Sequence, residues 1–462
     1  MMIPSAFLDR MRGILKEDFD SFCNALVEEN TVHAVRYNPE KIEKKDVLSA
    51  LSEALSPLSY ADDGYVCRVS KIGHHPLHHA GAIYSQDPGA MAPLNCLEVK
   101  KGWRVADFCA APGGKSTQLA SMVGDDGFVL SNEISLARCK TLASNIERLG
   151  VKNAIVTNVS TDVLASWFPS FFDLVVVDAP CSGEGMFRKY DVAGEEWSPE
   201  LVPMCAQRQA EILSHAAKTV TRGGYLLYST CTFSIEENEA NVDRFLEEHP
   251  EFSVCDVCER VKQVTADGVV FEGAKHPDVL KMARRFYPHL HPGEGQFMCL
   301  MQKEGGEACE RVSYAPPKSL LTKEEIMVAQ SFLKETLKEP LSKILPNYIL
   351  AKQGDFVCLL PAEIPLPPYR VYLAGVTLGT VQKGRLMPHH HFFSALGKQF
   401  RIRLELPLDT RELSAYLHGE TVPAPNLPNG YGVVTVLGAP IGGIKVVDGI
   451  AKNHYPKGLR SL

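Results

Sequence analysis

The middle of the chain, from about residue 76 to about residue 305, alternates between two hydrophobic patterns. Short apolar runs predict strands, and the longer stretches between them repeat their apolar positions at the spacing of a helix. This alternation is typical of an α/β fold with a parallel sheet, and the uninterrupted apolar run 174–177 predicts a strand that is covered on both faces. The expected strands are 104–108, 127–133, 174–178 and 224–229, with 296–302 as a last strand at the sheet edge, and the expected helices are 115–123, 135–149 and 200–220.

Smaller units flank this region. Residues 1–75 predict a small α+β domain, with helical spacing over 7–32 and a second helix over 44–55. The polar segment 305–317 predicts a linker, and Thr322 and Glu325 predict a capping box that starts a helix over 322–337. Frequent glycine and proline then predict a compact, mostly β region. We therefore expect four parts, which are the N-terminal domain 1–75, the α/β domain 76–305, a linker with a helical segment at 306–350, and the β region 351–462.

Composition narrows the class of protein. The chain has 462 residues, of which 45% are apolar and 22% are charged, so it has ample material for large folded cores. Its formal net charge of −7 excludes a uniformly basic nucleic-acid binder. Residues 351–462 nevertheless carry 12 basic and 7 acidic side chains. That local excess indicates a C-terminal surface that approaches a polyanion, although a merely solvated surface would have the same composition.

The cysteines, the N-terminal charges and the lengths of the apolar runs indicate in which compartment the protein acts and whether it binds a membrane or a metal. The 13 cysteines are odd in number and scattered, which favours reduced thiols and a cytoplasmic protein over a disulfide scaffold. The first 22 residues contain seven charged side chains, so we expect no signal peptide. No apolar run approaches the roughly 20 residues of a membrane helix, and we expect no membrane partner. Cys255 and Cys258 have no matching second pair, so we expect no metal.

A glycine-rich loop joins the expected strand 104–108 to the helix that follows it. The loop reads DFCAAPGGKST over residues 107–117, where Gly113 and Gly114 let the backbone approach a ligand at a helix N-terminus. The phosphate-binding motif GxxxxGK[ST] fails because Cys109 stands at its first glycine, and the dinucleotide motif GxGxxG fails as well. Glu133, at the end of the next strand, is placed to hold a ribose hydroxyl. The pattern favours a nucleoside site over a tight turn beside a surface carboxylate.

Cys181 and Cys231 each follow the C-terminal end of an expected parallel strand, where ligands bind in open α/β sheets. Either cysteine alone is more often an inert thiol, but two of them beside a nucleoside loop indicate chemistry. A thiolate that adds to C6 of a pyrimidine makes C5 nucleophilic toward a methyl group, and a second acid/base group then assists release. Asp178 can hydrogen-bond a protonated ring nitrogen or the amino group of a cofactor. An amine methyltransferase of the same fold would need no thiol.

At these motifs the chain resembles the RNA cytosine-C5 methyltransferases of the RsmB/RsmF family, most closely the RsmF branch that acts on 16S ribosomal RNA. The resemblance is strong over about residues 84–303, including the segments 107–118, 178–189 and 285–295, and weaker in the flanking regions. It implies a class I, Rossmann-like methyltransferase sheet between a small N-terminal α+β domain and a C-terminal, mostly β, PUA-like region that binds RNA.

The resemblance also implies the roles of individual residues. Cys231 would be the nucleophile, Cys181 would assist release, and Lys115 would face the target base. Ser160 stands where the family usually has an aspartate near the adenine. The implied ligands of the cofactor S-adenosyl-L-methionine are Cys109, Ala110, Ala111, Pro112, Gly113, Gly114, Lys115, Glu133, Arg138, Ser160 and Asp178.

We therefore expect a monomeric enzyme that methylates C5 of cytosine in 16S ribosomal RNA, free or within the small ribosomal subunit, with the target base swung out of its stack. Two alternatives stay open. Transfer RNA could supply the cytosine, because the choice of RNA lies in the flanking domains, or the chain could be a non-catalytic ribosome-assembly factor that kept the fold. Trp197, Arg188 and Lys189 either contact RNA or form a solvated loop. The run 389–391 of three histidines, followed by Phe392 and Phe393, could bind metal, stack on a base or pack in a core.

Overall fold

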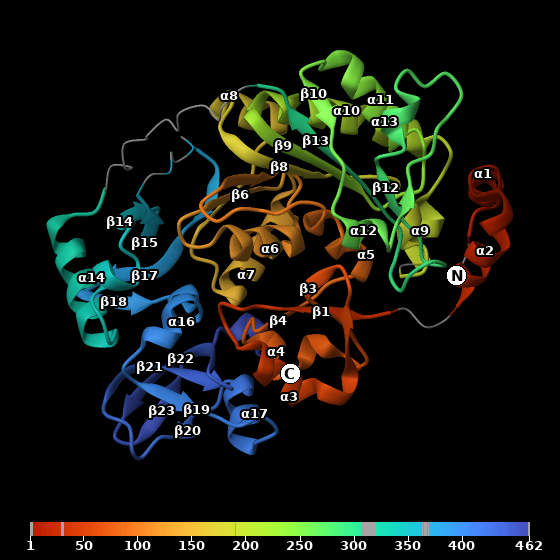
Figure 1. The fold of residues 1–462 in the computed structure, drawn as a ribbon. Helices are drawn as coiled ribbons and strands as arrows, with labels where there is room; N and C mark the ends of the chain where they lie inside the picture. Colours follow the sequence, from red (N-terminus) through yellow and green to blue (C-terminus); the bar gives the residue numbers. More distant parts are fainter. Residues whose placement is uncertain are drawn as a thin grey trace.

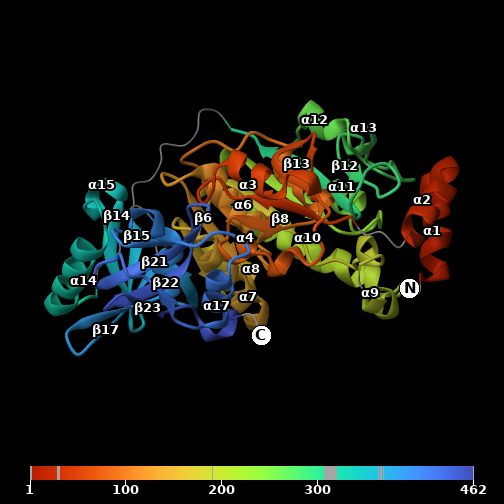
Figure 2. The same ribbon diagram turned by 90° about the horizontal axis from the view of Figure 1, so that it is seen from below.

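The computed structural model describes residues 3–28, 32–189, 191–305, 320–362, 364, 367 and 369–460 (Figures 1 and 2). Its centre is a ten-stranded sheet whose middle is parallel, in the order β9-β8-β5-β6-β7. Antiparallel strands β13, β12 and β11 continue the sheet beyond β9, and β10 also pairs with β13. The bounds are β5 Arg104–Asp107, β6 Phe128–Asn132, β7 Ala154–Thr157, β8 Phe172–Asp178, β9 Val220–Thr230, β10 Phe252–Val254, β11 Ala266–Asp267, β12 Arg284–Phe286 and β13 Gln296–Lys303.

Helices cover both faces of this sheet (Figure 1). Successive side chains of a strand point to opposite faces. Leu174 and Val176 of β8 therefore join one core cluster, while Val175 and Val177 join the other. The first core contains side chains of α6 (Gly114–Val123) and α7 (Leu136–Leu149), and the second contains side chains of α8 (Thr161–Trp167), α10 (Leu201–Thr219) and α11 (Glu239–Glu248). Burial on both faces explains the uninterrupted apolar run, and the expected α/β architecture with a parallel central sheet is confirmed.

The expected elements of the α/β region are present, with two differences. All four expected strands and all three expected helices form, with ends shifted by a few residues. The expectation that 296–302 lies at the sheet edge is wrong, because β13 lies between β9 and β12. Strand β7 is not among the expected strands, and its four residues form only a short apolar run.

The central sheet takes its last strand from the C-terminal region. Strand β16 (Val371–Ala374) pairs antiparallel with β7. Two backbone hydrogen bonds extend this contact, from the N–H of Gly375 to Ala154 at 2.9 Å and from the N–H of Asn158 to Arg370 at 3.1 Å. Leu373 is buried in the same core cluster as α6 and α7. The α/β region and the C-terminal region therefore share one sheet.

The N-terminal region consists of a helical pair and a small sheet. Helical spacing over 7–32 becomes two helices, α1 (Ser5–Leu15) and α2 (Phe19–Val27), because the chain turns at Lys16 with a φ of 49°. The antiparallel sheet has the order β2-β3-β1-β4 and takes its fourth strand from beyond residue 75. The bounds are β1 Ala34–Tyr37, β2 Leu55–Leu58, β3 Ala61–Cys67 and β4 Ile83–Ser85, with α3 Lys44–Leu51 beside them.

Residues 320–460 contain two further small sheets, and the expected mostly β character is confirmed. The expected capping box forms, because the Thr322 hydroxyl accepts from the N–H of Glu325 and the Glu325 carboxylate accepts from the N–H of Thr322. The expected linker, apart from its first residue, lies outside the described residues. One sheet contains β14 Tyr348–Gln353, β15 Phe356–Pro361, β17 Val376–Gln382 and β18 Arg385–Pro388, with α14 Lys323–Thr336; the other contains β19 Arg403–Glu405, β20 Val422–Pro423, β21 Gly430–Val436, β22 Ala439–Val447 and β23 Ile450–Asn453, with α16 His390–Leu396 and α17 Arg411–His418.

Candidate active site

The glycine-rich loop connects the C-terminal end of β5 to the start of α6. Gly113 precedes the helix with a φ of 110°, a conformation that favours glycine, and no side chain caps the helix. A Cβ atom added at Gly114 would lie 3.3 Å from the ring of Tyr84, so the backbone is closely packed on that side. Within the loop Cys109 is half-buried, Ala110 and Ala111 are buried, and Pro112 is exposed. The uncapped N–H groups of the first helical turn suit the polar groups of a small anion-bearing ligand.

Asp107, the last residue of β5, was not among the expected site residues. Its side chain is fully buried, and Oδ2 accepts a hydrogen bond from the Ser116 hydroxyl at 2.7 Å. Oδ1 is buried with no hydrogen-bond partner in the protein. Burial raises the pKa of this carboxyl to about 7. A buried oxygen without a partner beside a ligand loop fits a hydrogen-bond donor on a bound molecule.

Glu133 follows β6 and is connected to the loop by Arg138. The Glu133 carboxylate accepts from the N–H of Ser135 at 2.9 Å and lies 3.4 Å from the Arg138 guanidinium. That guanidinium also donates to the carbonyl of Ala111 at 2.9 Å. Arg138 therefore positions two expected cofactor-binding elements relative to each other.

Ser160 lies three residues after the end of β7 and directly before α8. Its hydroxyl bonds the carboxylate of Asp162, at the start of α8. The neighbouring amide of Asn158 instead donates to the carbonyl of Glu133 at 2.7 Å. Among the residues after β7, Asn158 is thus the one that holds the backbone at Glu133.

Asp178, at the end of β8, is fixed by side chains from three other elements. Lys115 of α6 donates to Oδ2 at 2.7 Å, and Ser229 of β9 donates to Oδ1 at 2.7 Å. Gln296 of β13 donates to Oδ1 at 3.3 Å. Lys115 is only 6% exposed, so its charge and that of Asp178 are partly shielded from water. A carboxylate held in this way keeps its direction toward a bound base or cofactor.

Cys181 and Cys231 meet at the same sheet edge. Strands β8 and β9 are parallel neighbours with Asp178 opposite Ser229, and the cysteines follow three and two residues later. Their sulfur atoms lie 3.1 Å apart, within reach of a thiol hydrogen bond. This hydrogen bond and burial raise the pKa of the Cys181 thiol, so Cys181 keeps its proton near neutral pH. The two thiols can therefore act on one bound base.

A buried carboxylate, that of Glu237, joins the loops that follow the two cysteines. Glu237, six residues after Cys231, accepts from the backbone N–H of Ser182 at 3.0 Å and from its hydroxyl at 2.5 Å. Gln209 of α10 donates to the same carboxylate at 2.8 Å. Burial raises the pKa of Glu237, and these donors oppose that shift. Glu237 therefore fixes the Cys181 loop relative to the Cys231 loop.

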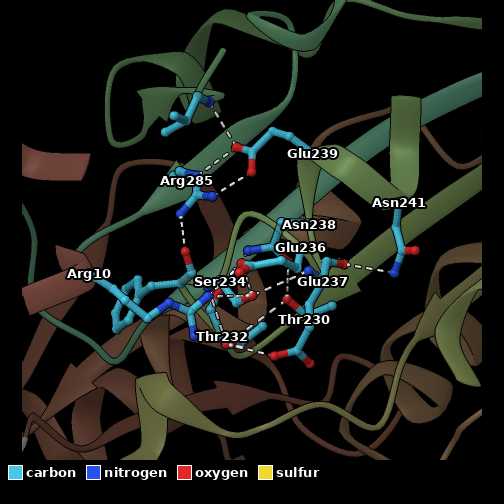
Figure 3. A network of polar contacts seen from close by, with 12 residues as sticks. Arg10, Thr230, Thr232, Ser234, Glu236, Glu237, Asn238, Glu239, Asn241 and Arg285 are labelled. Carbon is cyan, nitrogen blue, oxygen red and sulfur yellow. Dashed lines mark hydrogen bonds and ion pairs between the residues drawn. The ribbon is translucent and has the colours of Figure 1, made fainter. Parts of the chain in front are cut away.

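Arg285 of β12 binds the backbone of the loop that follows Cys231 (Figure 3). Its guanidinium forms a fully buried ion pair with Glu239 and donates to the carbonyl of Phe233 at 2.8 Å. This explains the arginine in the 285–295 segment as a positioning residue, since it holds the backbone two residues after Cys231.

The N-terminal helices cover these loops. Phe7 of α1 contacts the rings of Phe187, Trp197 and Phe233 at centroid distances of 5.0, 6.1 and 6.3 Å. Trp197 is 6% exposed, and its indole N–H donates to Glu184. The expectation that Trp197 contacts RNA or lies in a solvated loop is therefore wrong, because the helical pair buries it. The Arg188 side chain is also buried, 3.8 Å from the Glu294 carboxylate.

Two other patterns have structural roles. Cys258 donates to the carbonyl of Asn95 and packs beside a core cluster, and among the residues that the model describes no group of three or more His, Cys, Asp or Glu is placed to hold a metal ion. His391 is fully buried, and its ring bonds the carbonyl of Val151. Phe392 and Phe393 lie in a core cluster, so core packing is the correct interpretation of that run. No helix in the described ranges is long and apolar enough to cross a bilayer.

Family models match three parts of the chain. The model described as 16S rRNA methyltransferase RsmB/F matches residues 94–302. Two others, described as the N-terminal domain of 16S rRNA methyltransferase RsmF and as the methyltransferase RsmF PUA domain, match residues 3–88 and 403–461. The chain belongs to the RsmB/F methyltransferase family. The resemblance seen in the sequence is confirmed, including the PUA assignment, and the chain is an enzyme.

Relatives match nearly the whole chain. Proteins named ribosomal RNA small subunit methyltransferase F from Vibrio vulnificus (strain YJ016) and Erwinia tasmaniensis are 28% and 29% identical to it, each over 99% of this chain and 97% of the relative. A solved methyltransferase homologue from Pyrococcus horikoshii is 26% identical, with a TM-score of 0.54 over 62% of this chain and 91% of that chain. NSun6 from the same organism, solved with SFG, shares the fold, at 20% identity and a TM-score of 0.57 over 66% of this chain and 99% of that chain.

Proposed function

We propose that this enzyme transfers a methyl group from S-adenosyl-L-methionine to C5 of cytosine in 16S ribosomal RNA through a covalent bond between Cys231 and C6. The observation that carries the proposal is the 3.1 Å approach of the Cys181 and Cys231 sulfur atoms beside the fixed carboxylate of Asp178. An amine acceptor would require no pair of thiols here. The relatives that span the whole chain, N-terminal and PUA regions included, favour small-subunit ribosomal RNA over transfer RNA.

The residues around the glycine-rich loop fit the methyl donor. S-adenosyl-L-methionine supplies a methyl group on a positively charged sulfonium. The loop from Cys109 to Lys115 would bind its polar groups, the unpaired oxygen of Asp107 would accept from one of its donors, and Glu133 would hold ribose hydroxyls. Arg138 would act through Glu133, and Ser160 would border the adenine.

The two cysteines would have different roles, Cys231 as the nucleophile and Cys181 as a hydrogen-bond donor to its sulfur. The Cys231 thiolate forms a bond to C6 of cytosine, which makes C5 nucleophilic, and C5 takes up the methyl group. A water molecule then takes the C5 proton, and the electron pair of the C5–H bond forms the C5=C6 double bond as the S–C6 bond breaks. This restores the aromatic ring and returns Cys231 as a thiolate. Cys181, which keeps its proton, hydrogen-bonds this departing sulfur and so assists release. Asp178 and Lys115 would orient the base.

The other parts of the chain would serve substrate binding and support of the site. We propose that the regions 1–75, 76–305, 306–350 and 351–462 act as supporting domain, catalytic domain, connector and RNA-binding region of a monomer. The substrate base must leave its stack to reach Cys231, because C6 is inaccessible inside a helix. The mechanism needs reduced thiols, which fits action in the cytoplasm.

Mapping of 5-methylcytosine in 16S ribosomal RNA, with and without the gene, tests the substrate. We expect one or more sites to lose the modification, whereas loss in transfer RNA alone would favour that alternative.

Cys231→Ala should abolish turnover with purified protein. Cys181→Ala should accumulate a covalent protein–RNA adduct on denaturing gels. Normal methylation by Cys231→Ala would refute the proposed nucleophile.

A further inference from the structure

A groove of about 970 Å³ lies between helix α14 and the sheet of the PUA region. Its walls come from α14, from the β17–β18 hairpin and from β21 and β22, and α14 contacts β17, β18 and β21. Both views show α14 beside these strands (Figures 1 and 2). The groove is thus built jointly by the PUA sheet and the sheet that precedes it.

Aromatic and thioether side chains line the groove. The half-buried ring of Tyr431 meets Phe332 of α14 edge to face, with centroids 5.4 Å apart. Met327 and Met387, which are 63% and 43% exposed, add apolar surface to the groove. The groove therefore has apolar and aromatic surface that water covers only at a free-energy cost.

Positive charge accompanies this aromatic surface. Lys445 lies directly across from Tyr431 on the neighbouring strand, with Nζ 5.0 Å from the ring centre. Arg385, exposed on the hairpin, lines the groove as well, and Glu335 is the acidic residue in its lining. A second hollow of about 720 Å³ is lined by Lys334, Lys338 and Arg401, and by one acidic residue, Glu339. In a chain of net charge −7, this concentration of cations complements a polyanion.

We propose that this groove binds an unpaired segment of the substrate RNA away from the target cytosine, with a base against the ring of Tyr431 and backbone phosphates at Arg385 and Lys445. The inference rests on the proposed function, which makes RNA the substrate. Unpaired bases expose the faces that stack on aromatic rings, whereas a duplex hides them. We expect the ammonium group of Lys445 to move from the ring of Tyr431 to a backbone phosphate when a base stacks on that ring. The groove then gives the enzyme a second contact with its RNA, away from the two cysteines at the sheet edge.

Binding of a 12-nucleotide fluorescein-labelled single-stranded RNA to the full-length protein tests this inference. Tyr431→Ala should weaken binding about 10-fold, the range expected for loss of one stacked base. Lys445→Ala and Arg385→Ala should weaken it less and should lower the slope of log affinity against log salt by about 0.7 for each lost phosphate contact. Tyr431→Phe, which keeps the ring, and Lys457→Ala, which removes an exposed cation outside the groove, should bind like the wild type.

Two outcomes would overturn the inference. One is unchanged RNA affinity of Tyr431→Ala and Lys445→Ala, each shown to be folded by thermal melting. The other is cross-linking of the small subunit to Met387→p-benzoylphenylalanine that yields a ribosomal protein and no RNA. These results are separate from the proposed function, which is judged by methyl transfer of the wild type. Methylation by the wild type with no effect of the groove variants on binding would refute the groove alone, and groove-dependent binding without methylation would refute the proposed reaction alone.

Discussion

The guanidinium of Arg36, in the N-terminal domain, donates a hydrogen bond to the backbone carbonyl of Gly114, at the start of the helix after the glycine-rich loop, at 3.2 Å. It also donates to the Thr117 hydroxyl at 2.9 Å and to the Gln86 amide oxygen at 3.3 Å. The side chain is 1% exposed, so water cannot replace these bonds. The N-terminal domain therefore helps to position the glycine-rich loop.

We predict that Arg36→Ala weakens binding of S-adenosyl-L-methionine about 10-fold. Loss of a charged donor from a buried carbonyl leaves the loop less well positioned, and such bonds contribute roughly 1.5–3 kcal/mol. Isothermal titration calorimetry with the cofactor measures the effect. Arg36→Lys should restore part of the affinity, because it keeps the charge but not the forked geometry.

Lys41→Met is the matched control. Lys41 is another buried basic side chain of the same domain, but it donates to the carbonyl of Ser394 in the C-terminal region. We expect its loss to change thermal stability and leave cofactor affinity unchanged. Equal cofactor affinity of Arg36→Ala and the wild type would contradict the positioning role.

We predict that Glu237→Ala lowers kcat by roughly 10- to 100-fold, because small displacements of reacting groups have effects of this size. Glu237 holds the loop of Cys181 in place relative to that of Cys231 but does not touch the glycine-rich loop. Affinity for the cofactor should therefore stay at the wild-type value. Single-turnover methylation and calorimetry separate the two quantities. Glu236→Ala, which removes the more exposed neighbouring carboxylate, should keep most of the activity, and an equal loss in both variants would argue against the specific role of Glu237.

Asp107 makes stability depend on pH. Burial raises the pKa of its carboxyl to about 7 in the folded protein, above the ordinary value of 3.8, so the folded state binds the proton more tightly than the unfolded state. The stabilisation is fully present below pH 3.8 and is lost as pH rises through 7, by up to about 4 kcal/mol. We predict that Asp107→Asn flattens this part of the curve of unfolding free energy against pH.

Urea denaturation between pH 5 and pH 8.5 measures this effect. Burial also raises the pKa values of Glu147 and Glu294 to about 7. In Asp107→Asn, the part of the slope of unfolding free energy against pH that comes from these two carboxyls should therefore remain. Asp62→Asn, which replaces an exposed carboxylate, should leave the slope as it is in the wild type. An unchanged slope in Asp107→Asn would show that this carboxyl does not titrate in that range.

We predict that Leu373→Ala destabilises the catalytic sheet although the residue belongs to the C-terminal region. Leu373 is buried in the core against α6 and α7, and truncation of a buried leucine costs about 2–5 kcal/mol. Tyr372→Ala is the matched control, because Tyr372 is the adjacent residue of β16 and is 42% exposed. Urea denaturation should separate the two variants. Similar stability of both would mean that β16 contributes little to the sheet.

The parts of the molecule that depend on local sequence could be predicted. The glycine-rich loop, Glu133 and the two cysteines all follow strands whose apolar runs are visible in the sequence. Parallel neighbours end at the same edge, so their meeting followed from the strand assignment. Even the capping box at Thr322 could be predicted, because both partners lie within one turn of a helix.

Contacts between segments that are far apart in the sequence could not be predicted from the local pattern. Arg36 appears in the sequence as an ordinary residue of a short strand, and its role exists only because the fold brings its guanidinium within hydrogen-bond reach of α6. The position of Trp197 after the first cysteine motif predicts an RNA contact or a solvated loop. The apolar side chains that bury it include Phe7 of the first helix, which is far away in the sequence. The antiparallel strands β11 and β12 are two and three residues long, which is why β13 was placed at the edge.

The antiparallel pairing of β16 with β7 also constrains how the enzyme is made. During translation the catalytic segment emerges first. The backbone groups along one edge of β7 have no strand to pair with until β16, which ends at residue 374, has been synthesised. An unpaired strand edge beside an apolar core invites pairing with other nascent chains. We therefore expect a gene fragment that ends near residue 305 to give aggregates and not a free-standing catalytic module, so the C-terminal region could not be lost in evolution without a substitute for that one strand.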